Sequence, residues 1–189
     1  MRVRDDNKKT AICDAAITLI AANGFADTSM SKIAKAANVS PATIYVYFEN
    51  KEELLKQIYT LVKREMGTEL ARGLGPGISV KESFRLVWDN FYRYATVRSV
   101  RFAFTEQFAN SPLVDGCREE SMTYFRPLYE LVERGRSEKV FKDIPLEIFI
   151  AFTFAPLIGL IKQHISGEIV LDRKLLGSAY ELAWDAVAR

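Results

Sequence analysis

The sequence predicts an all-α protein in which an N-terminal three-helix domain with a helix-turn-helix precedes a larger helical body. Three observations indicate this fold: apolar residues recur at helical spacing, capping residues precede these segments, and runs typical of strands are few. The chain has 189 residues, of which 49% are hydrophobic, so it can bury the core of one or two domains. We expect the boundary between residues 1–52 and residues 53–189.

The first two helices are indicated by apolar spacing and by turn residues. One helix is expected over residues 8–22, where apolar side chains lie on one face and Asn23-Gly24 then supplies a stop signal. The next helix follows the cap candidates Asp27-Thr28-Ser29 and ends at the turn 38–40. Two helices of this kind, separated by a tight turn from a third, form a helix-turn-helix.

The third helix, expected from Pro41 to Phe48, is short, capped and rich in hydroxyl groups. Ser40 can accept a backbone hydrogen bond as the cap, and Pro41 suits the first helical position because its missing N–H has no partner there. Ile44 and Phe48, four residues apart, give this helix a narrow apolar stripe. The remaining side chains lie on or beside an exposed face, where they are free to contact a DNA major groove.

Capping signals also mark the helices of the body. A serine, asparagine or aspartate precedes several apolar segments, in two cases with a glutamate three positions later. Proline marks the start of two others. The signals are Asn50 with Glu53, Ser79 with Glu82, Pro127, Pro145 and Asp172.

The longest apolar run extends from Ile148 to Ile161, between Glu147 and Lys162. It is shorter than the roughly 20 residues that span a bilayer, so we expect a buried helix and no membrane partner. Aspartates near the N-terminus interrupt the pattern of a signal peptide. We therefore expect a cytoplasmic protein.

The net charge is +2, and the positive excess lies at the N-terminus. Residues 1–51 carry seven Lys or Arg against five Asp or Glu, whereas the remainder carries nineteen of each. This distribution permits nucleic-acid binding by the predicted helix-turn-helix without requiring it.

Catalytic and metal-binding patterns are not evident. Cys13 and Cys117 lack the spacing of a metal or redox motif, and His164 is the single histidine. There is no glycine-rich phosphate loop and no Ser/His/Asp arrangement. We therefore expect buried free thiols, no catalytic residues, no metal site, no cofactor and no enzymatic activity.

Residue types at fixed offsets in the first quarter to third of the chain resemble the DNA-binding domain of the tetracycline-repressor-like (TetR) family. The agreement spans three helices and is therefore more specific than one short motif. Residues 80–189 are similar to the family only in a general way. The matching segments are Gly24-Phe25, Thr28 to Ala34, Ala37 to Ser40, Thr43 to Phe48 and Asn50 to Leu54.

The resemblance implies a homodimeric transcription factor, usually a repressor, that binds double-stranded palindromic operator DNA and is released by a small-molecule effector. It implies phosphate contacts, which position the protein, and base contacts, which specify the sequence. Phosphate contacts at the start of the second helix agree with the free N–H groups found there. The phosphate candidates are Thr28, Ser29, Ser40, Tyr45, Tyr47 and Lys51, and the base candidates are Pro41, Ala42, Thr43 and Val46.

The base-facing residues differ from the family pattern, in which glycine or polar residues are frequent at these positions. Pro41, Ala42 and Val46 favour contact with thymine methyl groups over bidentate hydrogen bonds. Thr43 is therefore the candidate for polar base readout. For each tyrosine, packing against its own domain is the alternative role.

The body is rich in aromatic residues, most of which we expect in its core. Ligand cavities in helical bundles are lined mainly by apolar groups, and the resemblance assigns the pocket to these helices. We therefore expect an apolar or aromatic effector. The pocket candidates are Trp88, Phe91, Tyr94, Phe108, Tyr124 and Phe152, with His164 as a further candidate whose alternative role is structural.

Small residues on the last two helices predict the dimer interface, because they allow another helix to approach closely. The resemblance likewise implies a four-helix contact across a two-fold axis. Internal packing is the alternative role for each of these residues. The candidates are Ala155, Gly159, Ala179, Ala183 and Ala186.

A second class of function also fits a small helical protein. A helical adaptor would use the exposed face of the third helix to bind another protein and would not bind specific DNA. Salt-sensitive binding to DNA distinguishes the two hypotheses.

Overall fold

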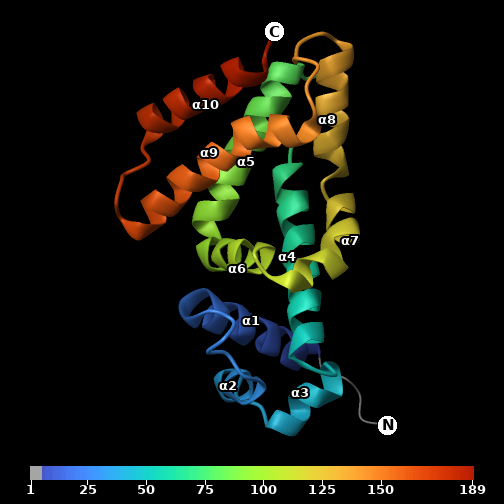
Figure 1. Cartoon of the computed structure of the whole chain (residues 1–189), viewed down its shortest axis with the longest axis vertical. Coiled ribbons are helices and arrows are strands. Elements are labelled where there is room, and N and C mark those ends of the chain that lie inside the picture. Colours follow the sequence, from blue (N-terminus) through green and yellow to red (C-terminus); the bar gives the residue numbers. More distant parts are fainter. Residues whose placement is uncertain (1–5) are drawn as a thin grey trace. The chain divides into compact units, whose positions relative to one another are not determined.

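The computed structural model describes residues 6–189, and its regular elements in this range are all helical (Figure 1). The predicted all-α class is therefore confirmed. In chain order the elements are α1 (Asp6–Asn23), α2 (Met30–Ala36), α3 (Pro41–Tyr47), α4 (Lys51–Leu70), α5 (Val80–Val97), α6 (Ser99–Ala109), the 3-10 helix η1 (Pro112–Cys117), α7 (Arg118–Thr123), α8 (Arg126–Ser137), α9 (Leu146–Ser166) and α10 (Arg173–Val187).

The described chain forms two compact units. The N-terminal unit comprises residues 6–65 and 100–123, and the body unit comprises residues 66–99 and 124–189. The chain passes between the units at residues 65/66, 99/100 and 123/124, and none of these three points coincides with the boundary expected after residue 52. The physical reason is that the first half of α4 and also α6 supply buried side chains to the core of the N-terminal unit.

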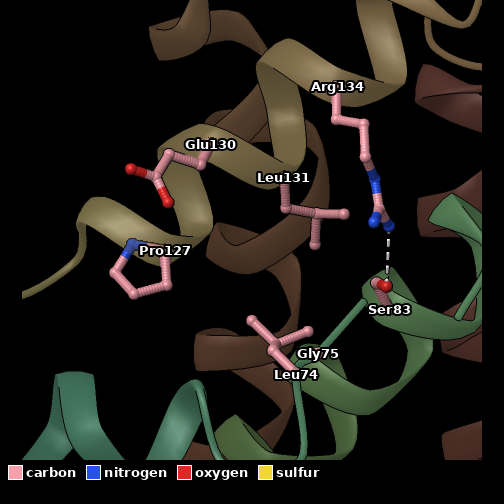
Figure 2. A pocket seen from close by; sticks show the side chains of 7 residues that line it. All are labelled: Leu74, Gly75, Ser83, Pro127, Glu130, Leu131 and Arg134. Carbon is pink, nitrogen blue, oxygen red and sulfur yellow. Dashed lines mark hydrogen bonds between the residues drawn. The ribbon is translucent and has the colours of Figure 1, made fainter. Parts of the chain in front are cut away.

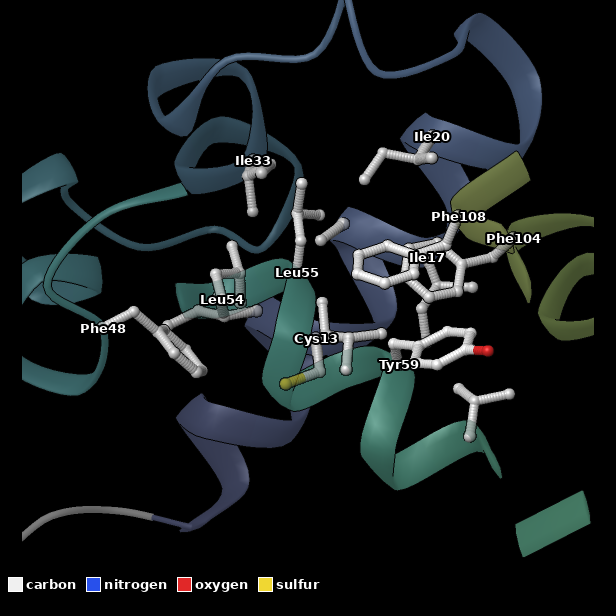
Figure 3. Packing of buried hydrophobic residues seen from close by; sticks show 14 of the residues in the cluster. Cys13, Ile17, Ile20, Ile33, Phe48, Leu54, Leu55, Tyr59, Phe104 and Phe108 are labelled. Carbon is white, nitrogen blue, oxygen red and sulfur yellow. The ribbon is translucent and has the colours of Figure 1, made fainter. Parts of the chain in front are cut away.

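The core of the N-terminal unit joins α1 to α4 with α6 (Figure 3). Phe104 and Phe108 of α6 are completely buried there. The Phe108 ring stacks on Tyr59 with 4.4 Å between ring centroids, and it meets Phe25 edge-on at 6.0 Å. These contacts make α6 an integral part of the unit that carries the helix-turn-helix.

Polar contacts reinforce this packing. Arg101 of α6 donates to the carboxylate of Asp14 on α1 at 2.7 Å, and its other Nη lies 3.3 Å from Glu65 on α4. Gln107 donates to the carbonyl of Ala21 at 3.3 Å. The arginine therefore links three helices of the N-terminal unit.

The core of the body unit is an aromatic cluster around Phe84 of α5. Its ring lies 5.9 Å from Phe149, 5.8 Å from Tyr180 and 5.8 Å from Trp184, so it joins α5 to α9 and α10. Trp88 donates its indole N–H to the carbonyl of Thr153 at 3.4 Å. Most aromatic residues of this unit are thus used for packing, as expected.

A glycine permits one close approach in the body unit. A Cβ on Gly135 of α8 would overlap the ring of Phe141. Phe141 is buried, and it pairs with Ala188 in an isolated antiparallel bridge. The glycine therefore lets Phe141, which pairs with the end of the chain, pack against α8.

The apolar helix α9 differs from the prediction of a buried helix. It has 21 residues and a mean hydropathy of 1.6, enough by length and composition alone to cross a membrane, yet only 22% of that stretch is buried. Phe149, Thr153, Leu157 and Ile161 recur every four residues and face the core. The helix is therefore buried along one stripe, and apolar side chains remain on its other faces.

Candidate functional site

The turn between α2 and α3 is fixed by local hydrogen bonds. Ser29 caps α2 by accepting from the N–H of Lys32 at 3.3 Å, and Ser40 caps α3 by accepting from the N–H of Thr43 at 3.2 Å. Asn38 adopts the left-handed conformation with φ 53°, in which asparagine is among the residues best tolerated. These features confirm the predicted helix-turn-helix geometry.

Buried side chains determine which face of α3 points outward. Ile44 is completely buried and Phe48 is 1% exposed, so the predicted stripe packs on the core. Tyr45 is 57% exposed and Val46 43% exposed, and Pro41 and Ala42 are also exposed. The outward face thus presents small apolar groups and a tyrosine.

Hydroxyl groups at the start of α3 interact with each other. The Ser40 and Thr43 oxygens lie 2.8 Å apart, and Thr43 is half-buried. Tyr47 is half-buried as well, packs against the unit's hydrophobic core and has its ring centroid 6.4 Å from that of Phe48. Tyr45, at 57% exposed, is more accessible than the half-buried Thr43 and Tyr47.

Two of the expected phosphate contacts are engaged with the protein. Thr28 is 2% exposed and donates its hydroxyl to the carbonyl of Gly24 at 2.9 Å, so this hydroxyl closes the turn after α1 and does not face solvent. Lys51, the first residue of α4, donates to the carbonyl of Phe25 at 2.5 Å. Ser29, in contrast, is exposed.

The residues predicted to line an effector pocket are divided between the two units. Trp88, Phe91 and Tyr94 are buried along α5 in the body unit, whereas Phe108 belongs to the core of the N-terminal unit. Phe152 is 58% exposed because it lies on α9 outside the buried stripe.

The two remaining pocket candidates, Tyr124 and His164, belong to the body unit. Tyr124 is half-buried just before α8. His164 accepts a hydrogen bond at Nδ1 from the N–H of Leu171 at 3.3 Å, which holds the turn after α9. This contact matches the structural role given above as the alternative for His164.

An open cavity of about 300 Å³ lies elsewhere in the body unit. Four of its residues come from one face of α8, two from the loop after α4 and one from α5. None of its residues was among the predicted pocket residues, although those on α8 recur at helical spacing. The lining residues are Leu74, Gly75, Ser83, Pro127, Glu130, Leu131 and Arg134.

The predicted interface residues on α9 and α10 differ in accessibility. Ala155 and Gly159 are exposed, and Ala179 and Ala186 are half-buried. Ala183 is 4% exposed, so it serves internal packing in this chain. Large apolar side chains are exposed nearby, including Phe152 at 58% and Leu182 at 73%.

Titratable and metal-binding groups add no further site. Within residues 6–189, no group of three or more His, Cys, Asp or Glu side chains could hold a metal ion. Burial raises the pKa of the Cys13 thiol to about 11, which disfavours the reactive thiolate. Cys117 is also a buried free thiol whose pKa is raised by burial.

Two family models match this chain. Residues 12–58 match the model described as bacterial regulatory proteins, tetR family. Residues 79–188 match the model described as tetracyclin repressor-like, C-terminal domain. The first match covers α2, α3 and the turn between them, and the second covers α5 to α10.

Individual proteins agree with these matches. The chain is 30% identical to an uncharacterized HTH-type transcriptional regulator of Haemophilus influenzae over 196 residues, covering 100% of both chains. It is 31% identical to a TetR family transcription regulator from Marinobacter aquaeolei VT8, whose crystal structure superposes with a TM-score of 0.91 and coverage of 100% and 99%.

A third similarity is confined to the N-terminal region. The chain is 46% identical to the fatty acid metabolism regulator protein of Bacillus subtilis over 65 residues. That match covers 34% of this chain and 32% of the relative.

Proposed function

This chain belongs to the TetR family of helix-turn-helix transcription regulators, and we propose that it is a repressor released from a palindromic operator by an apolar or aromatic effector. The observation that carries the proposal is the capped helix α3, whose Ile44 is buried while Tyr45 and Val46 are exposed. Family membership favours this function over a helical adaptor or an enzyme. A cytoplasmic location follows from the proposed action on DNA.

In the proposed complex, α3 lies in the major groove and phosphate contacts fix its register. Tyr45 and Ser40, together with Ser29 and the ammonium of Lys51, are the proposed phosphate ligands. Binding of Lys51 to phosphate requires it to share or leave the carbonyl of Phe25.

Base recognition is proposed to rest on the small groups of α3. Exposed Ala42 and Val46 offer methyl groups that suit thymine, and Pro41 lies beside them. Thr43 can donate to a base once its hydroxyl turns away from Ser40, which lies 2.8 Å away. Sequence-dependent DNA shape then contributes at positions that the protein does not touch.

The proposed dimer interface is the exposed apolar face of α9 and α10. Contiguous apolar surface on a soluble protein commonly marks an interaction site. Phe152 and Leu182 supply large side chains, and Ala155 and Gly159 leave room for a helix of the second copy. A two-fold axis would use this same face on both copies.

Release is proposed to be a population shift. An effector that binds better to the conformation of the free dimer than to that of the DNA-bound dimer lowers DNA affinity by the ratio of those affinities. Consequently, the effector must bind the operator complex more weakly than it binds the free protein.

Binding of the full-length protein to DNA enriched from a random pool tests the proposed function. Fluorescence anisotropy at several salt concentrations should give a specific, salt-sensitive affinity. Lys51→Ala should weaken binding to all sequences and lower the salt slope by about one, whereas Thr43→Ala should change the preferred sequence. Lys81→Ala, an exposed lysine of the body unit, is the matched control.

Two results would contradict the proposed function. One is the absence of any enriched sequence, which would favour the adaptor. The other is an equal loss of affinity in the Lys51 and Lys81 variants, which would assign the effect to overall charge.

A further inference from the structure

We infer that the cavity between α5 and α8 binds the carboxylate of a monoanionic apolar effector through Arg134 and Ser83. The inference deepens the proposed function and rests on it for its regulatory meaning. The cavity measures about 300 Å³, at the lower end of the range for small-molecule sites. It differs from the aromatic pocket expected from the sequence, because none of the residues predicted for that pocket lines it.

Arg134 and Ser83 meet at one side of the cavity, and Glu130 lies at the other side (Figure 2). Arg134 of α8 reaches across to α5 and donates from Nη2 to the hydroxyl oxygen of Ser83 at 2.9 Å. Ser83 is 1% exposed, and its hydroxyl retains a hydrogen that a carboxylate could accept. The Nε of Arg134 is buried without a hydrogen-bond partner in the described part of the chain.

The remaining lining is suited to an apolar chain or ring. Leu131 of α8 points toward Leu74 on the facing loop in Figure 2, and Pro127 extends the apolar surface by one turn of α8. Such a lining excludes water from the arginine side of the cavity when a ligand fills it. A guanidinium in that setting favours a planar carboxylate, with which it can form two parallel hydrogen bonds.

Neighbouring charges favour a monoanion over a phosphate dianion. Glu138 lies 3.8 Å from the Nε of Arg134, and Glu130 borders the cavity while paired with Arg126 at 2.8 Å. One carboxylate therefore lies close to the guanidinium and a second borders the cavity, so a dianion would be repelled more strongly than a monoanion. Glu138 is 52% exposed at its side chain, so it can turn to solvent when a ligand carboxylate replaces it.

The cavity is connected by the chain to the helix that follows α3. Leu74 and Gly75 lie in the loop directly after α4, which begins at Lys51 and ends at Leu70. A ligand that displaces this loop therefore acts on the end of α4. This covalent link gives the cavity a route by which occupancy can alter DNA affinity.

Isothermal titration of the full-length protein with octanoate, octanamide and inorganic phosphate tests the inference directly. Octanoate should bind at least about tenfold more tightly than octanamide, because only the carboxylate forms charge-assisted hydrogen bonds. Phosphate should bind more weakly than octanoate. Equal affinity for octanoate and octanamide, or preference for phosphate, would overturn the inference.

Variants locate the binding within the molecule. Arg134→Gln should weaken octanoate binding about tenfold or more, and Ser83→Ala should weaken it less while preserving the fold. Arg173→Gln is the control, because this exposed arginine of the body unit does not line the cavity. Unchanged octanoate binding in both the Arg134 and Ser83 variants, or an equal loss in the control, would overturn the assignment.

A DNA measurement separates this inference from the proposed function. Saturating octanoate should raise the dissociation constant for pool-selected DNA, and the Arg134 variant should bind the same DNA with a smaller response. Intact DNA binding that octanoate occupancy leaves unchanged would overturn the effector role and leave the DNA-binding function standing. Octanoate binding without any specific DNA binding would contradict the proposed function instead.

Discussion

Phe108→Ala should lower the free energy of unfolding of the N-terminal unit by about 4 kcal/mol, because α6 completes that unit's core. Phe108 is completely buried. Its ring centroid lies 4.4 Å from Tyr59 and 6.0 Å from both Phe25 and Phe104. Truncation of a buried phenylalanine costs roughly 3–5 kcal/mol, and loss of the stacked pair places this site in the middle or upper part of that range.

Urea denaturation followed by two probes measures this effect. Both tryptophans, Trp88 and Trp184, belong to the body unit, so their fluorescence reports on that unit, whereas far-UV circular dichroism reports on all helices. With a urea dependence of about 2 kcal/mol/M, the transition of the N-terminal unit should shift down by about 2 M. The dichroism transition should therefore begin before the fluorescence transition.

The control is Tyr45→Ala, which truncates an aromatic side chain of the same unit that is 57% exposed. It should change stability by less than about 1 kcal/mol. A comparably small effect of Phe108→Ala would refute the integration of α6 into this core. It would also restore Phe108 as a candidate for a pocket wall.

Three further predictions concern a glycine, a lysine and the dimer face. Gly135→Ala should lower the free energy of unfolding, measured by thermal denaturation, by about 1–3 kcal/mol, because the added Cβ overlaps the Phe141 ring. Burial lowers the pKa of Lys63 from 10.5 to about 8, while Glu106 acts in the opposite direction. Above pH 8 the unfolded chain keeps the Lys63 proton that the folded chain loses, so this lysine should raise the free energy of unfolding by about 1 kcal/mol from pH 8 to 9. Urea denaturation at the two pH values measures the rise, and Lys63→Met should abolish it. Leu182→Asp should make the proposed dimer monomeric in sedimentation velocity, because a two-fold axis through this face would place the charge in the apolar interface twice.

Each of these predictions has a contradicting result. An unchanged melting temperature for Gly135→Ala would mean that the Phe141 ring does not pack against α8 at Gly135. The pH range ends at 9 because burial raises the pKa of the Cys13 thiol from 9.0 to about 11. Between these two values the unfolded chain loses a proton that the folded chain keeps, which lowers stability. If the stability of the wild type and that of Lys63→Met depended equally on pH, the lowered pKa of the buried Lys63 amine would be contradicted. If Leu182→Asp remained a dimer, the interface would lie elsewhere.

Local features of the fold were predictable from the sequence. The caps at Ser40, Ser79 and Asp172 are present, each accepting from the backbone N–H three residues later. Such interactions depend on neighbours within one helical turn, so they can be recognised without knowledge of the tertiary structure. The outward face of α3 followed in the same way from the spacing of Ile44 and Phe48.

Long-range features were not predictable from the same patterns. Nothing local to Phe108 distinguishes a cavity wall from a core residue, because both are apolar positions on a helix. The apolarity of α9 indicated burial, whereas the chain alone buries only the stripe from Phe149 to Ile161. Likewise, Arg134 and Ser83 are 51 positions apart, and only folding brings them within hydrogen-bond distance.

Photo-crosslinking from α3 tests most directly whether this helix reads DNA. A benzophenone amino acid at Val46 in the full-length protein should crosslink to bases of pool-selected DNA at two symmetric positions, separated by about 10 base pairs or a multiple of this spacing. The same amino acid at Val170, which is 78% exposed in the body unit, should give no such crosslinks. Crosslinks from Val170 with none from Val46 would contradict DNA recognition by α3.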